Sequence, residues 1–468
     1  MVPMIAQELT RLLRRTSDLA REFLVSLPER PVGPGVDLSA LRKAMGGPLP
    51  EHGEEPLAVV EALARAAEPG IVATAGPRYF GFVVGGNHPA GLAADWLTTA
   101  WDQNACLYVM SPAAAVAEEI ASAWLVEIFG LPPDTSVGFT TGATMASFTA
   151  LAAARHAVLR RCGWDVEEEG LSGAPSITLI ASEQSHVTVF AALQMLGLGR
   201  GRVRQVAADD QGRMRADALR AALASVQGPA IVCAQSGNVN TGAFDPLAEI
   251  ADAVHARNGW LHVDGAFGLW AATVPALRHH LAGFENADSW TTDAHKWLNV
   301  PYDSGIVCIR DRQAHQRAMT LGASYYVESA SDERDSYNWV PESSRRARGF
   351  AVYATLRALG RRGVTALVER CCRLARRMAE RLGTDPDVEV LNEVVLNQVL
   401  VRFIPAHGGD PDAHTREVIR RVQVDGTCWL GGTMWHSMAA ARISVSNWST
   451  TEADIDRAAE AILRCARG

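Results

Sequence analysis

The sequence contains almost no lysine, and this scarcity is the first feature that bears on chemistry. Lysine and arginine together number 44, yet only Lys43 and Lys296 are lysines. A lysine amine can lose its proton and attack a carbonyl carbon, whereas an arginine guanidinium keeps its charge. Lys296 lies in the segment Asp293-Ala294-His295-Lys296-Trp297. We therefore take Lys296 as the first candidate for covalent chemistry.

The chain also lacks an excess of positive charge and any long apolar run. Its formal net charge is −8, and 48% of its residues are hydrophobic, which is ordinary for a soluble globular protein. An acidic balance argues against a broad nucleic-acid surface. No apolar run approaches the roughly 18 residues that a membrane span needs. We therefore expect no membrane partner. Residues 1–5 lack a basic region followed by an apolar one, so we expect no secretory signal and a cytoplasmic location.

No CxxC pair occurs among the eight cysteines. Cys233 and Cys308 lie in apolar runs. This pattern favours buried free thiols over disulfides or a metal site. The eight cysteines are Cys106, Cys162, Cys233, Cys308, Cys371, Cys372, Cys428 and Cys465.

A length of 468 residues indicates two or three domains. Residues 1–75 are expected to form a helical arm, interrupted by the Pro/Gly-rich stretch 28–53, that packs on the rest of the chain or on a second subunit. Residues 76–345 alternate helical and strand patterns and form a large domain. Residues 346–468 begin with long helical stretches, end with a strand and a capped helix, and form a smaller α+β domain.

Alternation of strands and helices predicts βαβ crossovers and a mostly parallel sheet that is covered on both faces. The predicted helices are 112–129, 144–162, 216–226 and 246–257. The predicted strands are 177–180, 203–206, 230–234, 261–263, 289–292, 305–309 and, in the small domain, 441–445.

Polar residues follow several of these strands, where ligands of parallel α/β sheets bind. Asp264 ends one strand, Lys296 lies just beyond another, and His186 follows a third; Thr141-Gly142-Ala143-Thr144 opens a helix whose N-terminus suits an anion. Singly, each has a structural explanation: a cap, a hydrogen-bonded histidine or a tight packing point. Together they supply an amine, a carboxylate, an imidazole plane and a phosphate site, which is what pyridoxal 5'-phosphate (PLP) requires.

In these segments the sequence resembles the group II PLP-dependent amino-acid decarboxylases, which include aromatic-L-amino-acid, glutamate and cysteine-sulfinate decarboxylases. The resemblance runs from about Arg78 to the C-terminus and implies the fold-type-I PLP-dependent transferase fold, an α/β fold, in a homodimer whose active site lies at the subunit interface. It is carried by Ser111-Pro112, Thr141 to Thr144, His186, Thr241-Gly242-Ala243-Phe244-Asp245, His262-Val263-Asp264, Asp293 to Trp297 and Arg442-Ile443-Ser444.

The resemblance also implies roles for single residues. Lys296 would hold PLP as an internal aldimine, and Asp264 would pair with the pyridinium nitrogen. His186 would stack on the ring and help to position the substrate. The remaining implied contacts are Ala266 below the ring, Ala143, Thr144 and His295 at the phosphate, Arg442 at the substrate carboxylate, and Asn104 and Cys106 reaching in from the partner subunit.

Departures from the family pattern leave the substrate and the last step open. The family's usual His-Val-Asp-Ala-Ala-Tyr is here His262 to Phe267, and the wall after Tyr79-Phe80 continues with Gly81 to Gly86, so an aromatic substrate does not follow. The family's mobile loop, whose tyrosine protonates the product, corresponds to 323–341. That stretch contains Tyr325, Tyr326 and Tyr337, of which Tyr337 is nearest the catalytic position.

Several other functions remain to be weighed against amino-acid decarboxylation. Without a protonating tyrosine, a PLP-dependent aldehyde synthase, which decarboxylates with oxidative deamination, becomes the alternative, beside an aminotransferase. His262-x-Asp264 with a later histidine imitates the ligands of a non-haem iron oxygenase, but the alternating pattern does not suit that fold. A catalytically inactive relative is opposed by the presence of both Lys296 and Asp264, and no G-x-S-x-G segment supports a serine hydrolase.

Overall fold

Two sheets organise the chain in the computed structural model, which describes residues 2–320 and 333–468. The strands are β1 (Ser136–Thr140), β2 (Thr178–Ser182), β3 (Arg204–Val206), β4 (Ala230–Gln235), β5 (Trp260–Asp264), β6 (Ser289–Asp293), β7 (Gly305–Ile309), β8 (Val388–Val390), β9 (Gln398–Phe403), β10 (Gly431–Trp435) and β11 (Met438–Ser444). The first seven form the large sheet in the order β1-β7-β6-β5-β4-β2-β3, and the last four form the small one. In the large sheet only the pairings made by β7 are antiparallel, which confirms the predicted mostly parallel sheet.

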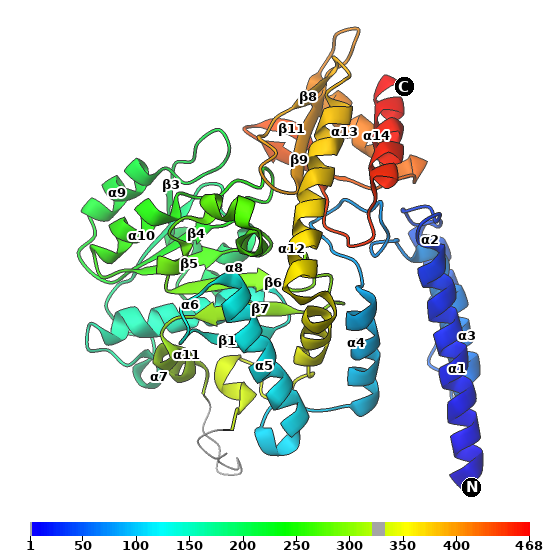
Figure 1. The fold of residues 1–468 in the computed structure, drawn as a ribbon, viewed down its shortest axis with the longest axis horizontal. Coiled ribbons are helices and arrows are strands. Elements are labelled where there is room, and N and C mark those ends of the chain that lie inside the picture. Colours follow the sequence, from blue (N-terminus) through cyan, green and yellow to red (C-terminus); the bar gives the residue numbers. More distant parts are fainter. Residues whose placement is uncertain (1, 321–332) are drawn as a thin grey trace.

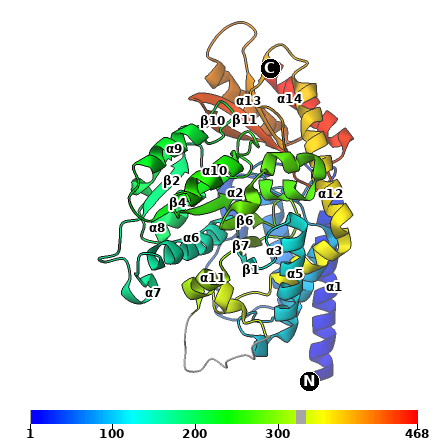
Figure 2. The same cartoon turned by 60° about the vertical axis from the view of Figure 1, so that its left-hand side comes forward.

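Helices cover both faces of the large sheet (Figures 1 and 2). The α-helices are α1 (Val2–Ser26), α2 (Leu38–Met45), α3 (Pro56–Ala67), α4 (Pro89–Trp101), α5 (Pro112–Phe129), α6 (Ala143–Arg160), α7 (Val166–Glu169), α8 (Val187–Met195), α9 (Ala216–Ala224), α10 (Leu247–His255), α11 (Arg312–Met319), α12 (Gly349–Leu382), α13 (Pro411–Asp425) and α14 (Glu452–Arg467). Along β4, Val232 packs into the core under α5, α9 and α10, while Ile231 and Cys233 pack into the core under α6 and α8. A strand buried on both sides is typical of a parallel sheet.

The predicted elements agree with the structure except at their ends. The helix 112–129 is α5, and Ser111 caps it by accepting a hydrogen bond from the Ala114 N–H. The strand 305–309 is β7. The Pro/Gly-rich stretch 28–53, expected to interrupt the helices of the arm, itself contains α2, because Asp37 accepts the Ala40 N–H and starts a helix there.

The small sheet follows α12, which links the two sheets. In Figure 1, α12 runs from beside α5 and α4 toward β9 and α14, and it contacts all four elements. The last helix begins at the predicted capping box, in which Thr451 accepts the Asp454 N–H and Asp454 accepts the Thr451 N–H. Arg442 lies on β11, paired with Gly431 on one side and Leu400 on the other.

The expectation of buried thiols holds for six of the eight cysteines. Cys162 is exposed and Cys465 is partly exposed. Cys162 departs from the expectation because it follows the end of α6, where the chain turns at the surface. Across the described residues, no helix is both long and apolar enough to cross a membrane.

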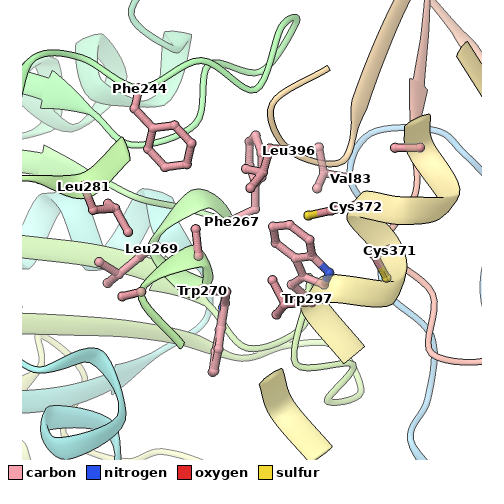
Figure 3. Packing of buried hydrophobic residues seen from close by; sticks show 14 of the residues in the cluster. Val83, Phe244, Phe267, Leu269, Trp270, Leu281, Trp297, Cys371, Cys372 and Leu396 are labelled. Carbon is pink, nitrogen blue, oxygen red and sulfur yellow. The ribbon is translucent and has the colours of Figure 1, made fainter. Parts of the chain in front are cut away.

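The large core lies directly behind the segment that carries Lys296. Trp297 is fully buried there between Phe267 and the α12 residues Cys371 and Cys372 (Figure 3). The centroids of the Phe267 and Trp297 rings lie 6.5 Å apart. Because Trp297 follows Lys296 in the chain, its burial fixes the backbone from which the lysine side chain projects.

A buried ion pair fastens the segment after the large sheet to α5. Glu118 contacts Arg345, and both side chains are only 1% exposed. Arg345 also donates to the carbonyls of Ala105 and Phe139, and Ser336 donates to Glu118 at 2.7 Å. The pair therefore joins α5, β1, the Asn104 segment and residues 336–345.

Replacing Glu118 by alanine should lower the free energy of unfolding by about 3–5 kcal/mol, because Arg345 would remain buried without its carboxylate. Denaturant unfolding measures this change. Glu119→Ala, at the exposed neighbouring position, is the control and should cost at most about 0.5 kcal/mol. Equal effects of the two substitutions would show that the buried pair does not stabilise the fold.

Candidate active site

A cavity of about 470 Å³ lies at the carboxyl ends of β4, β5 and β6. Neighbouring strands bring Gln235, Asp264 and Asp293 to this edge, since Gln235 pairs with Asp264 and Asp264 with Thr291. The cavity is lined by eight of the residues that the sequence singled out, namely Ala143, Thr144, His186, Asp264, Ala266, His295, Lys296 and Arg442.

Asp293 connects most of these residues to one another. Its Oδ2 lies 2.9 Å from Lys296 Nζ, and its Oδ1 accepts the Ala143 N–H at 2.6 Å and lies 3.6 Å from His295 Nε2. The Asp293 N–H donates to the Ala266 carbonyl at 2.9 Å. One buried carboxylate at the end of β6 thus orients the lysine, a histidine and the first turn of α6.

The backbone of the Lys296 segment packs against Gly85 and is joined to neighbouring segments by Asn299. A Cβ on Gly85 would lie 1.9 Å from the Lys296 carbonyl oxygen, so only glycine fits there. Asn299 accepts the Gly86 N–H and the Trp448 N–H and donates to the Ser446 carbonyl. Residues 85–86, the lysine segment and the chain after β11 therefore meet at Asn299.

Asp264 and His186 face the same cavity. Asp264 is 7% exposed, and its Oδ1 accepts the Ala266 N–H at 3.0 Å. His186 is the N-cap of α8. Burial lowers the pKa of His186, and the Asp264 carboxylate partly opposes that shift. The site thus holds a carboxylate and an uncharged imidazole near the lysine.

The N-terminus of α6 forms the end of the cavity that suits an anion. Gly142, before its first residue, provides no side-chain cap. His295 packs against Gly142, and its Nδ1 accepts the Ser304 N–H at 3.0 Å. The Tyr302 ring stacks on His295 with centroids 4.2 Å apart. Burial raises the pKa of Tyr302 to about 12, so its hydroxyl keeps its proton.

Arg442 enters the cavity from the small sheet. Its Nη1 donates to the Val239 carbonyl at 3.3 Å. Within the described ranges 2–320 and 333–468, no carboxylate is paired with this guanidinium. Burial lowers the Arg442 pKa, as expected for a cation in partly desolvated surroundings. An arginine in this position favours an anionic ligand.

Three predicted site residues lie elsewhere in the chain. Asn104 accepts the Arg345 N–H at 3.1 Å, Cys106 Sγ lies 3.3 Å from Ser343 Oγ, and the Tyr337 N–H donates to the Cys106 carbonyl at 3.2 Å. None of the three lines the cavity of its own chain. Tyr325 and Tyr326, from the same predicted loop, lie outside the described residues.

Sequence reasoning gave no role to several residues that line the cavity, among them Asp293, Thr188 and Tyr302. Asp293 directly follows the predicted strand 289–292 and stands three residues before the lysine, but a strand-end aspartate has the same local pattern when it only caps a turn. Tyr302 stands six residues after the lysine in a segment without regular structure, so no periodicity points to it. Thr188 lies in the first turn of a helix and is found only through its contact with His186.

The residues of the cavity fit PLP. An amine, a carboxylate and an anion site converge on one space, and the donor set at the α6 end suits a phosphate. Asp264 has one oxygen bonded to a backbone N–H and no cation paired with it among the described residues. A protonated pyridine nitrogen would satisfy such a carboxylate.

Comparison with known proteins gives the same result. A family model described as the pyridoxal-dependent decarboxylase conserved domain matches residues 40–404. An aromatic-L-amino-acid decarboxylase of Bacillus atrophaeus is 28% identical over 458 residues, which cover 96% of this chain and 93% of the relative. An L-2,4-diaminobutyrate decarboxylase of Rhizobium meliloti (strain 1021) is 32% identical over 384 residues, which cover 80% and 75% of the two chains.

A solved structure agrees in fold. The crystal structure of Oryza sativa TDC with PLP and tryptamine superposes with a TM-score of 0.91 at 24% identity and covers 98% of each chain. At this identity the likeness shows the fold alone.

Gly85→Ala should displace the Lys296 backbone and lower the affinity for PLP by at least about tenfold, because the new Cβ overlaps the lysine carbonyl. Absorbance titration of the apoprotein with PLP measures the affinity. Gly201→Ala is the control, since no atom lies within 4 Å of its added Cβ. A Gly85→Ala protein that binds PLP like the wild type would contradict the proposed packing.

Proposed function

The chain belongs to the pyridoxal-dependent decarboxylase family, and from this premise we propose which of its residues carry out the reaction. It is a PLP-dependent carboxy-lyase that acts on an amino acid. We propose that Lys296 is the residue that binds PLP covalently. The observation that carries this assignment is the position of Lys296 Nζ, 2.9 Å from the Asp293 carboxylate in the cavity that also contains Asp264.

When bound, PLP supplies a carbonyl that combines with amines and a ring that withdraws electrons from the bond to be broken. Asp264 would keep the pyridine nitrogen protonated, which strengthens that withdrawal. His186 would stack on the ring, and Ala266 would contact its opposite face. The phosphate ligands in the proposal are Ala143, Thr144 and His295, at the start of α6 and beside it.

Arg442 would bind the α-carboxylate of the substrate. Among the charged side chains that line the cavity, Lys296 is paired with Asp293, which leaves Arg442 as the cation available to a ligand within the described part of the chain. A single guanidinium matches a single carboxylate. We therefore propose a substrate whose side chain carries no second carboxylate, and Phe82 and Val83, which line the same cavity, favour apolar contact with it.

The assembly is proposed to be a homodimer in which Asn104, Cys106 and Tyr337 reach the partner's cavity. This is supported by their position together outside their own cavity, where Asn104 accepts the Arg345 N–H and Cys106 contacts both Ser343 and the Tyr337 N–H. Tyr337 would then protonate the product in the partner site. The division at residues 75 and 345 and the cytoplasmic location stay predictions.

Two measurements on the PLP-loaded protein test the proposed function. Borohydride treatment and peptide mapping should place the mass of the cofactor on Lys296 and not on exposed Lys43. A panel of amino acids should include one that yields CO2 and an amine, as detected by mass spectrometry. Lys296→Ala should abolish the product, whereas Lys43→Ala should retain it.

Other products would reassign the reaction. An aldehyde with ammonia would identify an aldehyde synthase, and a 2-oxo acid would identify an aminotransferase. Cofactor mass on Lys43 would contradict the assignment of Lys296.

Arg442→Met should raise KM for the substrate by about 10- to 100-fold with a smaller change in kcat, because a charged hydrogen bond to the α-carboxylate is lost. Steady-state kinetics measure both constants. The product amine, which has no carboxylate, is the matched probe, and its inhibition constant should not change. An inhibition constant that rises as much as KM would show that Arg442 does not recognise the carboxylate.

A further inference from the structure

His186 is held at one ring nitrogen by Thr188, the second residue of α8. Its Nδ1 lies 2.7 Å from Thr188 Oγ1 and 3.4 Å from the Thr188 backbone nitrogen. Through the second contact the imidazole is the N-cap of α8. Histidine replaces here the Ser, Thr, Asp or Asn that usually occupies this position.

The contact with the backbone N–H indicates which nitrogen carries the proton. A backbone N–H is always a donor, so Nδ1 has to accept the hydrogen bond from Thr188 N–H. A proton on Nδ1 would face that N–H and remove the cap. With Nδ1 as acceptor, the Thr188 hydroxyl also donates to it, and the proton of the neutral ring lies on Nε2.

The surroundings keep the ring uncharged. Burial lowers the pKa of His186 most strongly. The charged groups around it come from three elements and the lysine segment: Asp264 on β5 and Asp293 on β6 raise the pKa, while Lys296 and Arg442 on β11 lower it. His186 is therefore a neutral hydrogen-bond donor at Nε2.

We propose that Thr188 is a positioning residue that fixes His186 in the Nε2–H form, so that this N–H binds the substrate carboxylate beside Arg442. His186, Thr188 and Arg442 line one cavity. In this form His186 does not accept a proton at Nε2, so it orients the carboxylate and does not act as a base there. The carboxylate as ligand rests on the proposed function, whereas the fixed tautomer rests on the contacts of Thr188 alone.

A pair of substitutions isolates the hydroxyl of Thr188. Thr188→Val keeps the size and removes the hydroxyl, and Thr188→Ser restores it; both keep the backbone N–H. Histidines labelled with ¹⁵N in the PLP-loaded enzyme report the tautomer and the pKa, and His186→Gln identifies the His186 signals.

In the wild type, the His186 signals should show protonated Nε2 and unprotonated Nδ1. Thr188→Val keeps only the 3.4 Å contact from the backbone N–H to Nδ1 and loses the 2.7 Å contact with the hydroxyl. The Nδ1–H form should therefore become populated, and the pKa of His186 should rise because the neutral ring loses a donor to Nδ1. The value of kcat/KM should fall on the order of tenfold, as for one lost side-chain hydrogen bond. Thr188→Ser should restore the tautomer, the pKa and most of kcat/KM.

A Thr188→Val enzyme with the wild-type tautomer and pKa would overturn the proposal, as would a wild type with the proton on Nδ1. A fall in kcat/KM without any change in the ¹⁵N signals would also contradict it, because that result assigns Thr188 a merely structural role. Failure to decarboxylate any amino acid would overturn the proposed function, and the NMR result would still decide the role of Thr188.

Discussion

The structure of the site depends on one buried carboxylate, Asp293. An aspartate without access to water is stable as an anion only if cations and N–H donors surround it. Lys296, the Ala143 N–H and His295 provide these partners. Because all three partners contact the same carboxylate, the lysine, the start of α6 and the end of β6 are held next to one another, and they line the cavity.

The rest of the chain closes around that alignment. Gly85 fits against the Lys296 carbonyl, Trp297 is buried against α12, and Asn299 joins residues 85–86 to the chain after β11. Arg442 then reaches the cavity from the small sheet. Segments hundreds of residues apart in sequence thus contribute to one site, and cofactor affinity and fold stability are expected to change together when these contacts are altered.

Much of this arrangement could be predicted from the sequence because polar residues directly after an apolar strand pattern mark where each strand ends. An apolar strand that ends in Asp264, and another followed by His295 and Lys296, have to meet at one edge of a parallel sheet. The importance of Asp293 escaped the prediction because a strand-end aspartate has the same local pattern whether it caps a turn or pairs with a lysine. Thr188 escaped because the tautomer of His186 follows from distances, which a pattern of residue types does not contain.

The most direct test of the account is to run the reaction in D₂O and analyse the product by mass spectrometry. Decarboxylation replaces the carboxylate by one solvent hydrogen, so the account predicts an amine with one non-exchangeable deuterium at the former α-carbon and one CO2 released per amine. An aldehyde, a 2-oxo acid, or an amine without that deuterium would contradict it.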